Sequence, residues 1–215
     1  MRYVINKTPA ASSHQVMGKP THDPSPWVVL NPPAAAYPLD LHGAIPSIDD
    51  VNYAAARAGT GRWLYDPVWG LGQAAVGQST FINFYGDQVW YCNETFLSFG
   101  SPPAASATLR IFMMSVQTGE DPAVLDQSFT LEVREYDFGA TLESGDWAAG
   151  ANLGSYTLLG SMFIPTSVPA GWYEVSLTAA STHLILCSDR HRSGTAPVLG
   201  TPDEWINITD AELVV

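Results

Sequence analysis

Apolar and polar residues alternate along most of this chain after about residue 60, and this period of two restricts its fold more than any other feature. In "QSFTLEVREY", Phe129, Leu131 and Val133 fall on one face and the residues between them are polar. In "GWYEVSLT", the apolar face runs from Tyr173 to Leu177. Such alternation is typical of a strand with one buried face. Both segments are predicted to be half-exposed strands.

Clusters of Gly, Pro, Asn and Asp separate these segments from other strand-like runs, as turns do. About ten short strands with this spacing predict an all-β fold, a jelly-roll-like antiparallel β-sandwich. Helix is expected only at 49–59 and as one turn in "ESGDWAAG". The further strands are predicted at 61–65, 80–85, 88–99, 107–116, 155–164, 182–188, 204–208 and 211–215.

The first 48 residues have a different composition, because prolines interrupt any ladder or helix. We predict an extended Pro-rich N-terminal arm over 1–48, with one short strand at 27–30, and a jelly-roll domain over 49–215. A disordered tail is the alternative, but such tails carry few apolar residues. The arm residues expected to contact neighbouring subunits are Tyr3, Ile5, Trp27, Val29, Leu30 and Tyr37.

One strand-like run, "ATLRIFMMSV", is apolar on both faces. Leu109, Ile111 and Met113 define one face, and Phe112 and Met114 lie on the other. A strand of this kind must be covered twice. Phe112 and Met114 are therefore predicted to contact the arm or a neighbouring subunit.

Charge excludes several classes of partner. The net charge is −12, and the only lysines are Lys7 and Lys19. A nucleic-acid-binding protein needs clustered cations, so no nucleic-acid partner is expected.

No apolar run is long enough to span a membrane, and the N-terminus lacks the apolar core of a signal peptide. We therefore expect a protein that is made in a cytoplasm and does not insert into a membrane.

The two cysteines, Cys92 and Cys187, each lie in an apolar run. They are expected to be reduced core residues, as in most cytosolic proteins, with a disulfide between neighbouring strands as the alternative.

Three carboxylates, Asp137, Glu143 and Asp146, lie close enough in sequence to suggest a hydrolytic pair. Their context favours turns instead. Asp137 and Gly139 fit a strand-ending turn, in which Gly supplies a positive φ. Glu143 and Asp146 stand where a short helix would start, a position that favours acidic residues.

The segment "LCSDRHRSG" gathers Ser188, Asp189 and His191, which are the residue types of a nucleophilic triad. Triads assemble from distant segments, so this crowding favours ion pairs of Asp189 with Arg190 and Arg192 in an ordered loop. No catalytic residue and no metal site is predicted, because His and Cys spacings match no metal motif. A structural calcium ion near "GEDPAVLD" is the one alternative, because oxygen ligands alone suffice for this ion.

Seven tryptophans and nine tyrosines raise the possibility of sugar binding. Trp147, Trp172 and Tyr173 lie near predicted turns and are the candidates for stacking on a glycan. Core or interface packing is the more general role of such residues.

Three segments, "TFLSFGSPPAASATLRIFMMSV", "FTLEVREYDFGATLESGDWAAGANLGSYTLLGSM" and "HLILCSDRHRSGTAP", together resemble a β-sandwich module. This module recurs in minor tail and other structural proteins of tailed bacteriophages and is similar to jelly-roll modules of the carbohydrate-binding type. The resemblance covers residues 85 to 198. The Asp that usually follows the first strand of the module is absent here, where Gly100 and Ser101 follow Phe99.

The resemblance implies a non-enzymatic structural protein of a virion: a minor tail, fibre or capsid decoration subunit. Such a protein would dock on other virion subunits through its arm, and we expect a homo-oligomer. The alternative is a carbohydrate-binding module that recognises a host surface glycan.

Overall fold

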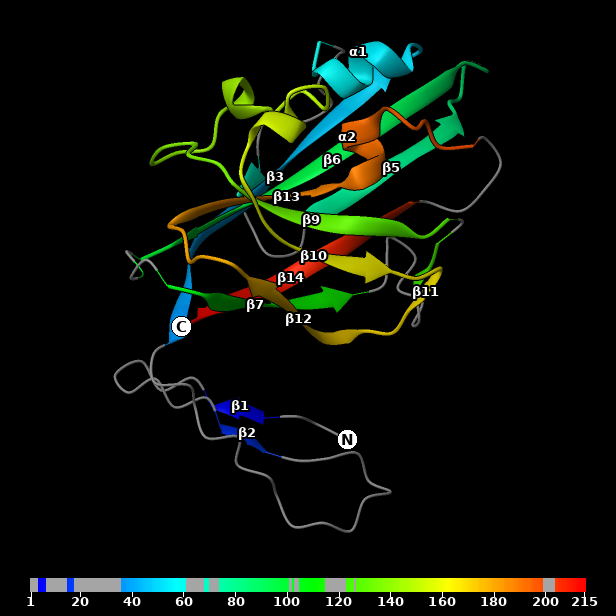
Figure 1. Cartoon of the computed structure of the whole chain (residues 1–215). Coiled ribbons are helices and arrows are strands. Elements are labelled where there is room, and N and C mark those ends of the chain that lie inside the picture. Colours follow the sequence, from blue (N-terminus) through cyan, green and yellow to red (C-terminus); the bar gives the residue numbers. More distant parts are fainter. Residues whose placement is uncertain are drawn as a thin grey trace.

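The computed structural model describes residues 4–6, 15–17, 36–60, 68–69, 74–100, 102, 105–114, 123–125, 127–198 and 204–215. These residues form antiparallel strands and two short α-helices, which confirms the all-β fold predicted from the sequence (Figure 1). None of the described helices is long and apolar enough to cross a membrane.

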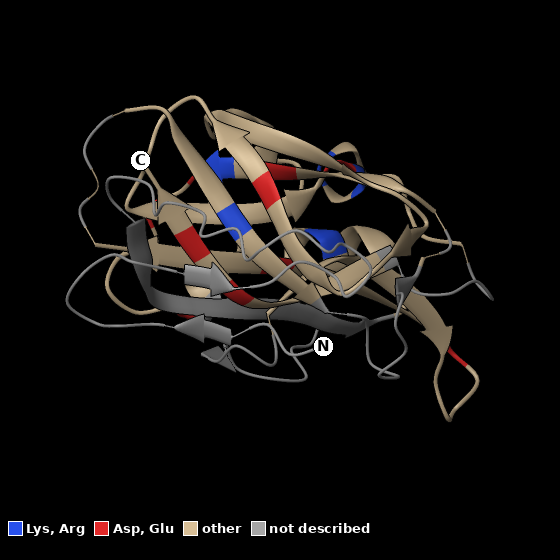
Figure 2. Cartoon of the chain, turned by 90° about the horizontal axis from the view of Figure 1, so that it is seen from below, with Lys and Arg blue, Asp and Glu red and all other residues tan. Residues whose placement is uncertain are grey.

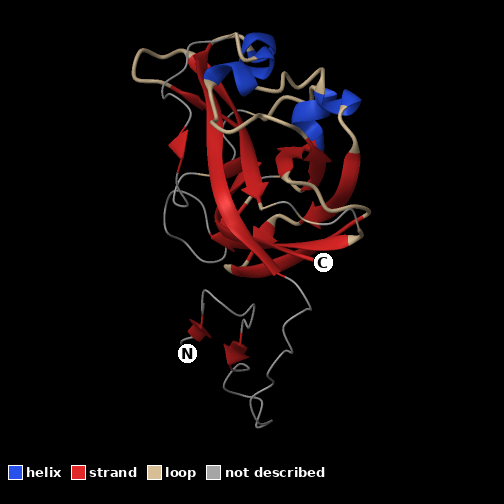
Figure 3. Cartoon of the chain, turned by 90° about the vertical axis from the view of Figure 1, so that its left-hand side faces the viewer, coloured by secondary structure: helices blue, strands red, loops and turns tan. Residues whose placement is uncertain are grey.

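The strands are β1 (Val4–Asn6), β2 (Gln15–Met17), β3 (Ala36–Asp50), β4 (Val68–Trp69), β5 (Ala75–Ile82), β6 (Gln88–Phe99), β7 (Ala107–Met114), β8 (Ala123–Val124), β9 (Phe129–Glu135), β10 (Leu158–Ile164), β11 (Ser167–Val168), β12 (Gly171–Leu177), β13 (His183–Ser188) and β14 (Glu204–Val214). The α-helices are α1 (Tyr53–Ala58) and α2 (Asp189–Ser193), and short 3-10 turns lie at η2 (Ser144–Asp146) and η3 (Leu153–Ser155). Both helices lie at the same end of the β structure (Figure 3).

The main sheet has the strand order β10-β9-β13-β6-β3-β14-β7-β12, with β5 paired to both β6 and β14 and β4 paired to β3. Its two ends nearly meet, because Thr178, just after β12, donates its N–H to Leu159 O of β10 at 2.9 Å. Gly160 permits this approach: a Cβ there would lie 2.4 Å from Ser176 O. The sheet therefore wraps around the larger of two clusters of buried residues, the main core.

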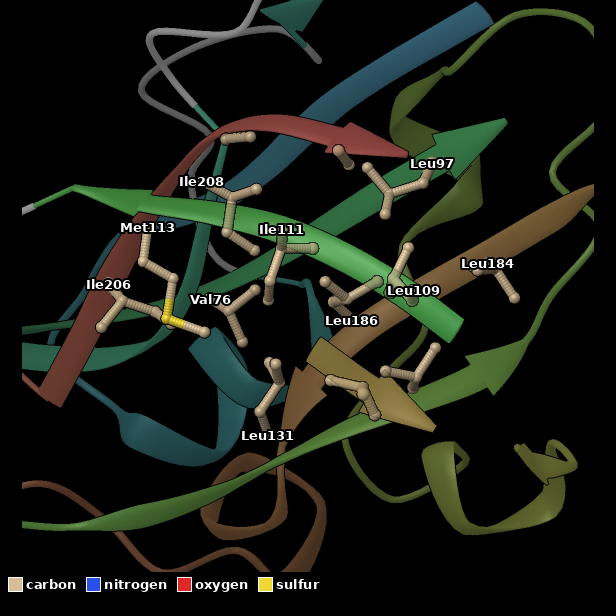
Figure 4. Packing of buried hydrophobic residues seen from close by; sticks show 14 of the residues in the cluster. Val76, Leu97, Leu109, Ile111, Met113, Leu131, Leu184, Leu186, Ile206 and Ile208 are labelled. Carbon is tan, nitrogen blue, oxygen red and sulfur yellow. The ribbon is translucent and has the colours of Figure 1, made fainter. Parts of the chain in front are cut away.

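The core lies between β6, β9 and β13 on one side and β7, β12 and β14 on the other (Figure 4). The inward residues are the alternate ones that the sequence predicts. Leu109, Ile111 and Met113 of β7 are fully buried, and Val175 and Leu177 of β12 are nearly so. The half-exposed strand predicted at β12 is confirmed, because Glu174 and Ser176 are exposed.

Strand β3 pairs with β6 along most of its length and with β14 at its start. The strand begins at residue 36 and so crosses the boundary that the sequence analysis set at residue 48. Its antiparallel pairing with β6 runs from Leu39↔Phe99 to Asp50↔Trp90. Residues 36–50 are therefore part of the main sheet. The strands predicted at 27–30 and 61–65 lie outside the described residues.

The outer face of β6 and β13 is also apolar, and residues 136–156, here called the cover, lie across it. The outer cluster comprises Phe96, Phe138, Leu142, Ala148, Leu153, Ile185 and Cys187, with Tyr136, Trp147 and Tyr156 packed against it. Because alternate residues of β6 belong to the two cores, Phe96 faces the cover while Leu97 and Phe99 face the main core. The C-terminal part of strand β6 is thus buried on both faces.

Candidate functional site

The carboxylates that suggested hydrolysis are parts of turns in the cover. Asp137 Oδ1 accepts from Gly139 N at 2.9 Å, and Gly139 has a φ of 77°. Asp146 Oδ2 accepts from Glu143 N at 2.6 Å, within the 3-10 turn η2. The predicted turn at Asp137 and the single helical turn are confirmed.

The triad-like segment is helix α2 and not the predicted loop. Ser188 caps the helix, and its hydroxyl accepts from His191 N at 3.0 Å. Asp189 Oδ1 accepts from Thr130 N of β9 at 2.8 Å. Arg192 pairs with Glu132 of β9 at 2.9 Å, whereas the sequence predicted Asp189 as its partner. Ser188 thus meets the backbone of His191 and not its ring.

The polar side of β9 is buried, which corrects the half-exposed strand that its alternation predicted. Glu132 and Arg134 are only 5% and 6% exposed. Glu132 Oε2 accepts from Arg134 Nη2 at 2.9 Å, and Arg134 Nη1 donates to Tyr156 O of the cover at 2.6 Å. Alternation alone could not predict this, because α2 and the cover lie over the polar face.

Helix α1 is tied to α2 through Arg57. Its Nε donates to His191 O at 2.7 Å and its Nη2 donates to Arg192 O, so the guanidinium binds carbonyls at the end of α2. The backbone O of Arg57 in turn accepts from Gly150 N of the cover at 3.0 Å. The predicted helix at 49–59 is confirmed but shorter, because its cap is Asn52 and Asp49 and Asp50 belong to β3.

Two titratable side chains meet in the centre of this assembly. Glu94 of β6 and His191 of α2 are both 0% exposed, with Oε1 of the first 3.5 Å from Nδ1 of the second. Burial raises the pKa of Glu94 well above its ordinary range, although Oε2 accepts from Ala148 N. Burial lowers the pKa of His191 to about 4, and the nearby charge of Arg57 acts in the same direction.

Both cysteines lie near this pair and are free, buried thiols. Burial raises the pKa values of Cys92 and Cys187, and any negative charge on Glu94 would act in the same direction. Thiols of this kind are inert, because the thiolate is the reactive form. Within the described residues, no group of three or more His, Cys, Asp and Glu side chains is placed to hold a metal ion. Most of "GEDPAVLD" lies outside the described residues.

The three aromatic residues predicted to stack on glycans lie in separate places. Trp147 packs in the cover, with its ring centroid 5.4 Å from that of His191. Tyr173 packs against the main core and donates its hydroxyl to Pro169 O at 2.7 Å. Trp172 lies on the outer face of β12, in edge contact with Phe112 at 5.5 Å. The guanidinium of Arg110 lies 5.3 Å from the centre of the Trp172 ring.

Of the predicted assembly contacts, Tyr3, Trp27, Val29 and Leu30 lie outside the described residues. Ile5 belongs to β1, which pairs with β2. Tyr37 lies in β3, opposite Leu213 of β14. Met114 ends β7, and Phe112 is partly buried beside Trp172.

The most exposed aromatic residues lie at a place that the sequence analysis did not select. The β5–β6 hairpin projects from the molecule, at the lower right of Figure 2, and carries Phe84 and Tyr85 in its turn. These side chains are 99% and 85% exposed, and Phe81 and Ile82 beside them are 41% and 49% exposed. We call these four residues the aromatic tip.

The turn itself is built by the polar residues that flank the two rings. Asn83 Oδ1 accepts from the N–H groups of Tyr85 and Asp87, each at 2.9 Å. Gly86 donates to Asn83 O at 3.0 Å and has a φ of 89°. Asn at the first and Gly at the fourth position are typical of a hairpin turn. The sequence "NFYG" carries this signal, although the predicted strand at 80–85 included Phe84 and Tyr85.

Comparison with protein-family models and with curated proteins gave no match to this chain.

Proposed function

We propose that this protein is a non-enzymatic structural subunit of a larger assembly, and that it associates through the aromatic tip. The observation that carries the proposal is the exposure of Phe84 and Tyr85, at 99% and 85%. Neither ring is needed for the turn, since Asn83 and Gly86 supply its hydrogen bonds. Exposed aromatic side chains are favoured contacts in protein interfaces, because they bury a large area at little conformational cost.

Five polar residues of β9, β13 and α2 have structural partners, which agrees with a structural role. Glu132 pairs with both Arg134 and Arg192, and Ser188 and Asp189 accept hydrogen bonds from backbone N–H groups. The resemblance of residues 85–198 to virion modules supports the finer proposal of a bacteriophage tail, fibre or capsid decoration subunit. In that setting the chain before β3 would make a second contact with neighbouring subunits.

The test is the mass of the purified full-length protein in solution, measured by light scattering over a range of concentrations. We expect a homo-oligomer whose association weakens at least ten-fold in the double variant Phe84→Ser, Tyr85→Ser, as for the loss of interface anchors worth more than about 1.4 kcal/mol. Phe163→Ser is the matched control, because Phe163 is 65% exposed on β10, outside the tip. Equal masses for the protein and the double variant would contradict association through the tip.

A truncation separates the tip from the N-terminal segment. It should end at residue 34, because β3 begins at Ala36 and a longer deletion would remove part of the sheet. If the truncated protein is a folded monomer while the double variant still associates, the N-terminal segment and not the tip makes the contact.

Glycan binding is the second candidate function, and Trp172 is the residue that favours it. The ring lies on the outer face of the sheet near Arg110, Glu174 and Glu212, which could bond to sugar hydroxyls. On a glycan array, specific binding that is lost in Trp172→Ala and kept in Tyr85→Ala would support this function.

A further inference from the structure

Glu94 and His191, which have no part in the proposed function, form a buried pair whose number of bound protons can be inferred from its contacts. Glu94 Oε1 and His191 Nδ1 face each other at 3.5 Å, both residues are 0% exposed, and neither atom has a hydrogen-bond partner elsewhere. Buried polar atoms are rarely left without a partner. A proton between these two atoms would satisfy both.

The other contacts of the two side chains fix where this proton lies. His191 Nε2 is 3.4 Å from Arg57 O, and a carbonyl only accepts, so Nε2 carries a hydrogen. In the neutral ring, Nδ1 is then a lone pair. Glu94 Oε2 accepts from Ala148 N at 3.1 Å, so the carboxyl proton belongs on Oε1.

The surrounding groups favour a neutral pair over an ion pair. The Arg57 cation from α1 opposes an imidazolium at His191. The thiols of Cys92 on β6 and Cys187 on β13, and Tyr136 and Trp147 from the cover, also lie near the pair. Burial disfavours charge on either partner.

We propose that one proton, held on Glu94 Oε1 and donated to His191 Nδ1, fastens the cover and helix α2 to the outer face of β6. The carboxyl group contacts the cover through Ala148 N and α2 through His191. Loss of the proton places a buried carboxylate against a lone pair. The cover is then released, and the outer cluster beneath it becomes accessible.

The pH dependence of this device follows from counting protons. We call the pair closed when the cover and α2 enclose it, and open when it is exposed to water. The open pair binds one proton between pH 4.5 and 6.5, the ordinary pKa values of Glu and His. The closed pair also holds one, so closure is independent of pH in this window. Above 6.5 the open pair loses its proton and the closed pair keeps it, because the pKa of Glu94 is raised. The opening constant then increases about ten-fold per pH unit until Glu94 ionises.

On the acid side the sign is reversed. Below pH 4.5 the open pair binds two protons and the closed pair one, since the pKa of His191 is lowered to about 4. Opening therefore increases again as the pH falls, until His191 itself becomes protonated. The closed state is most stable in mildly acidic solution.

Glu94→Gln separates the proton from the contacts. A glutamine amide can donate to His191 Nδ1 and its carbonyl can accept from Ala148 N, so both contacts persist without a titrating proton. The measurement is the rate at which an aromatic disulfide reagent labels Cys187 and Cys92, from pH 6 to pH 9. Labelling takes place in the opened state, where both thiols are in water, so thiolate formation accelerates it alike in the two proteins. The ratio of wild-type to variant rates therefore reports opening.

We expect this ratio to rise by about ten-fold per pH unit above 6.5. A ratio that stays constant with pH would overturn the proposal. A second measurement needs no variant: nitrogen NMR of His191 in the full-length protein at pH 7 should show a neutral ring with its hydrogen on Nε2. An imidazolium, or a hydrogen on Nδ1, would overturn the proposal even if Glu94→Gln did not fold.

Discussion

Apolar side chains are buried at the C-terminal end of strand β6 and exposed in the turn next to its N-terminal end. Toward its C-terminus the strand is buried on both faces, with Leu97 in the main core and Phe96 under the cover. Toward its N-terminus it leaves the body of the protein with β5, and Phe84 in the connecting turn is 99% exposed. Apolar residues that fold the chain and apolar residues available to a partner thus lie close together in sequence.

Whether an apolar residue of this region packs in the core or remains available to a partner therefore depends on cover by other segments, and not on its hydrophobicity. The covered end is enclosed by α1, α2 and residues 136–156, which meet through Arg57, Glu94 and Glu132. The hairpin has no such cover within the described part of the chain. Substitutions at the two ends should therefore differ in effect.

The largest difference is expected between two phenylalanines. Phe96 is 0% exposed and contacts Phe138 with ring centroids 5.5 Å apart. Phe96→Ala should lower the free energy of unfolding by about 3–5 kcal/mol, as for other buried phenylalanines. Phe84→Ala should change it by no more than about 0.5 kcal/mol. Urea denaturation of both variants measures this, and similar values would contradict the double burial of β6.

A smaller difference is expected between two glycines that both have positive φ. A Cβ at Gly59, which ends α1, would lie 2.1 Å from Trp147 Cδ1, whereas a Cβ at Gly86 in the hairpin meets nothing within 4 Å. Gly86→Ala should reduce stability by about 1 kcal/mol through its backbone alone. Gly59→Ala adds overpacking and should reduce it by roughly 3 kcal/mol.

The part of the stability loss that Gly59→Ala owes to overpacking can be tested separately. Combining Gly59→Ala with Trp147→Ala removes the clash, so the two substitutions together should be less destabilising than the sum of their separate effects. Additive effects would show that Trp147 does not pack on the end of α1.

The smallest difference lies within the aromatic tip. The rings of Phe81 and Tyr91 stack with centroids 5.0 Å apart, although Phe81 is 41% exposed. Phe81→Ala should reduce stability by about 1 kcal/mol, the typical value of one aromatic pair. Thermal unfolding should place it between Phe84→Ala and Gly59→Ala. An effect of Phe81→Ala no larger than that of Phe84→Ala would show that the stack contributes nothing.

Much of the fold could be predicted because period-two alternation and turn residues are local signals. The predicted strand at 88–99 coincides with β6, and the inward residues of β7 and β12 are correct. Other boundaries moved: β5 begins at Ala75 and ends at Ile82, and the strands predicted at 204–208 and 211–215 form one strand, β14, with a register shift between Ile208 and Asp210. A bulge of this kind breaks alternation without ending the strand.

The candidate sites were harder to predict, because their properties depend on what lies opposite each residue. His191 stood out in the sequence only for its neighbours in the chain, while its partner Glu94 is 97 positions earlier. Phe84 and Tyr85 read as the end of a strand, although "NFYG" also fits a turn.

Neighbouring residues along the chain were enough to specify the antiparallel β class, the inward faces of β7 and β12 and the turn at Asp137. The burial of Glu132 and Arg134, the contact of Glu94 with His191 and the exposure of Phe84 follow from the tertiary arrangement alone. Burial and pKa depend on segments that fold over a residue from far along the chain. The residues next to a position in the sequence do not indicate which distant segments will cover it.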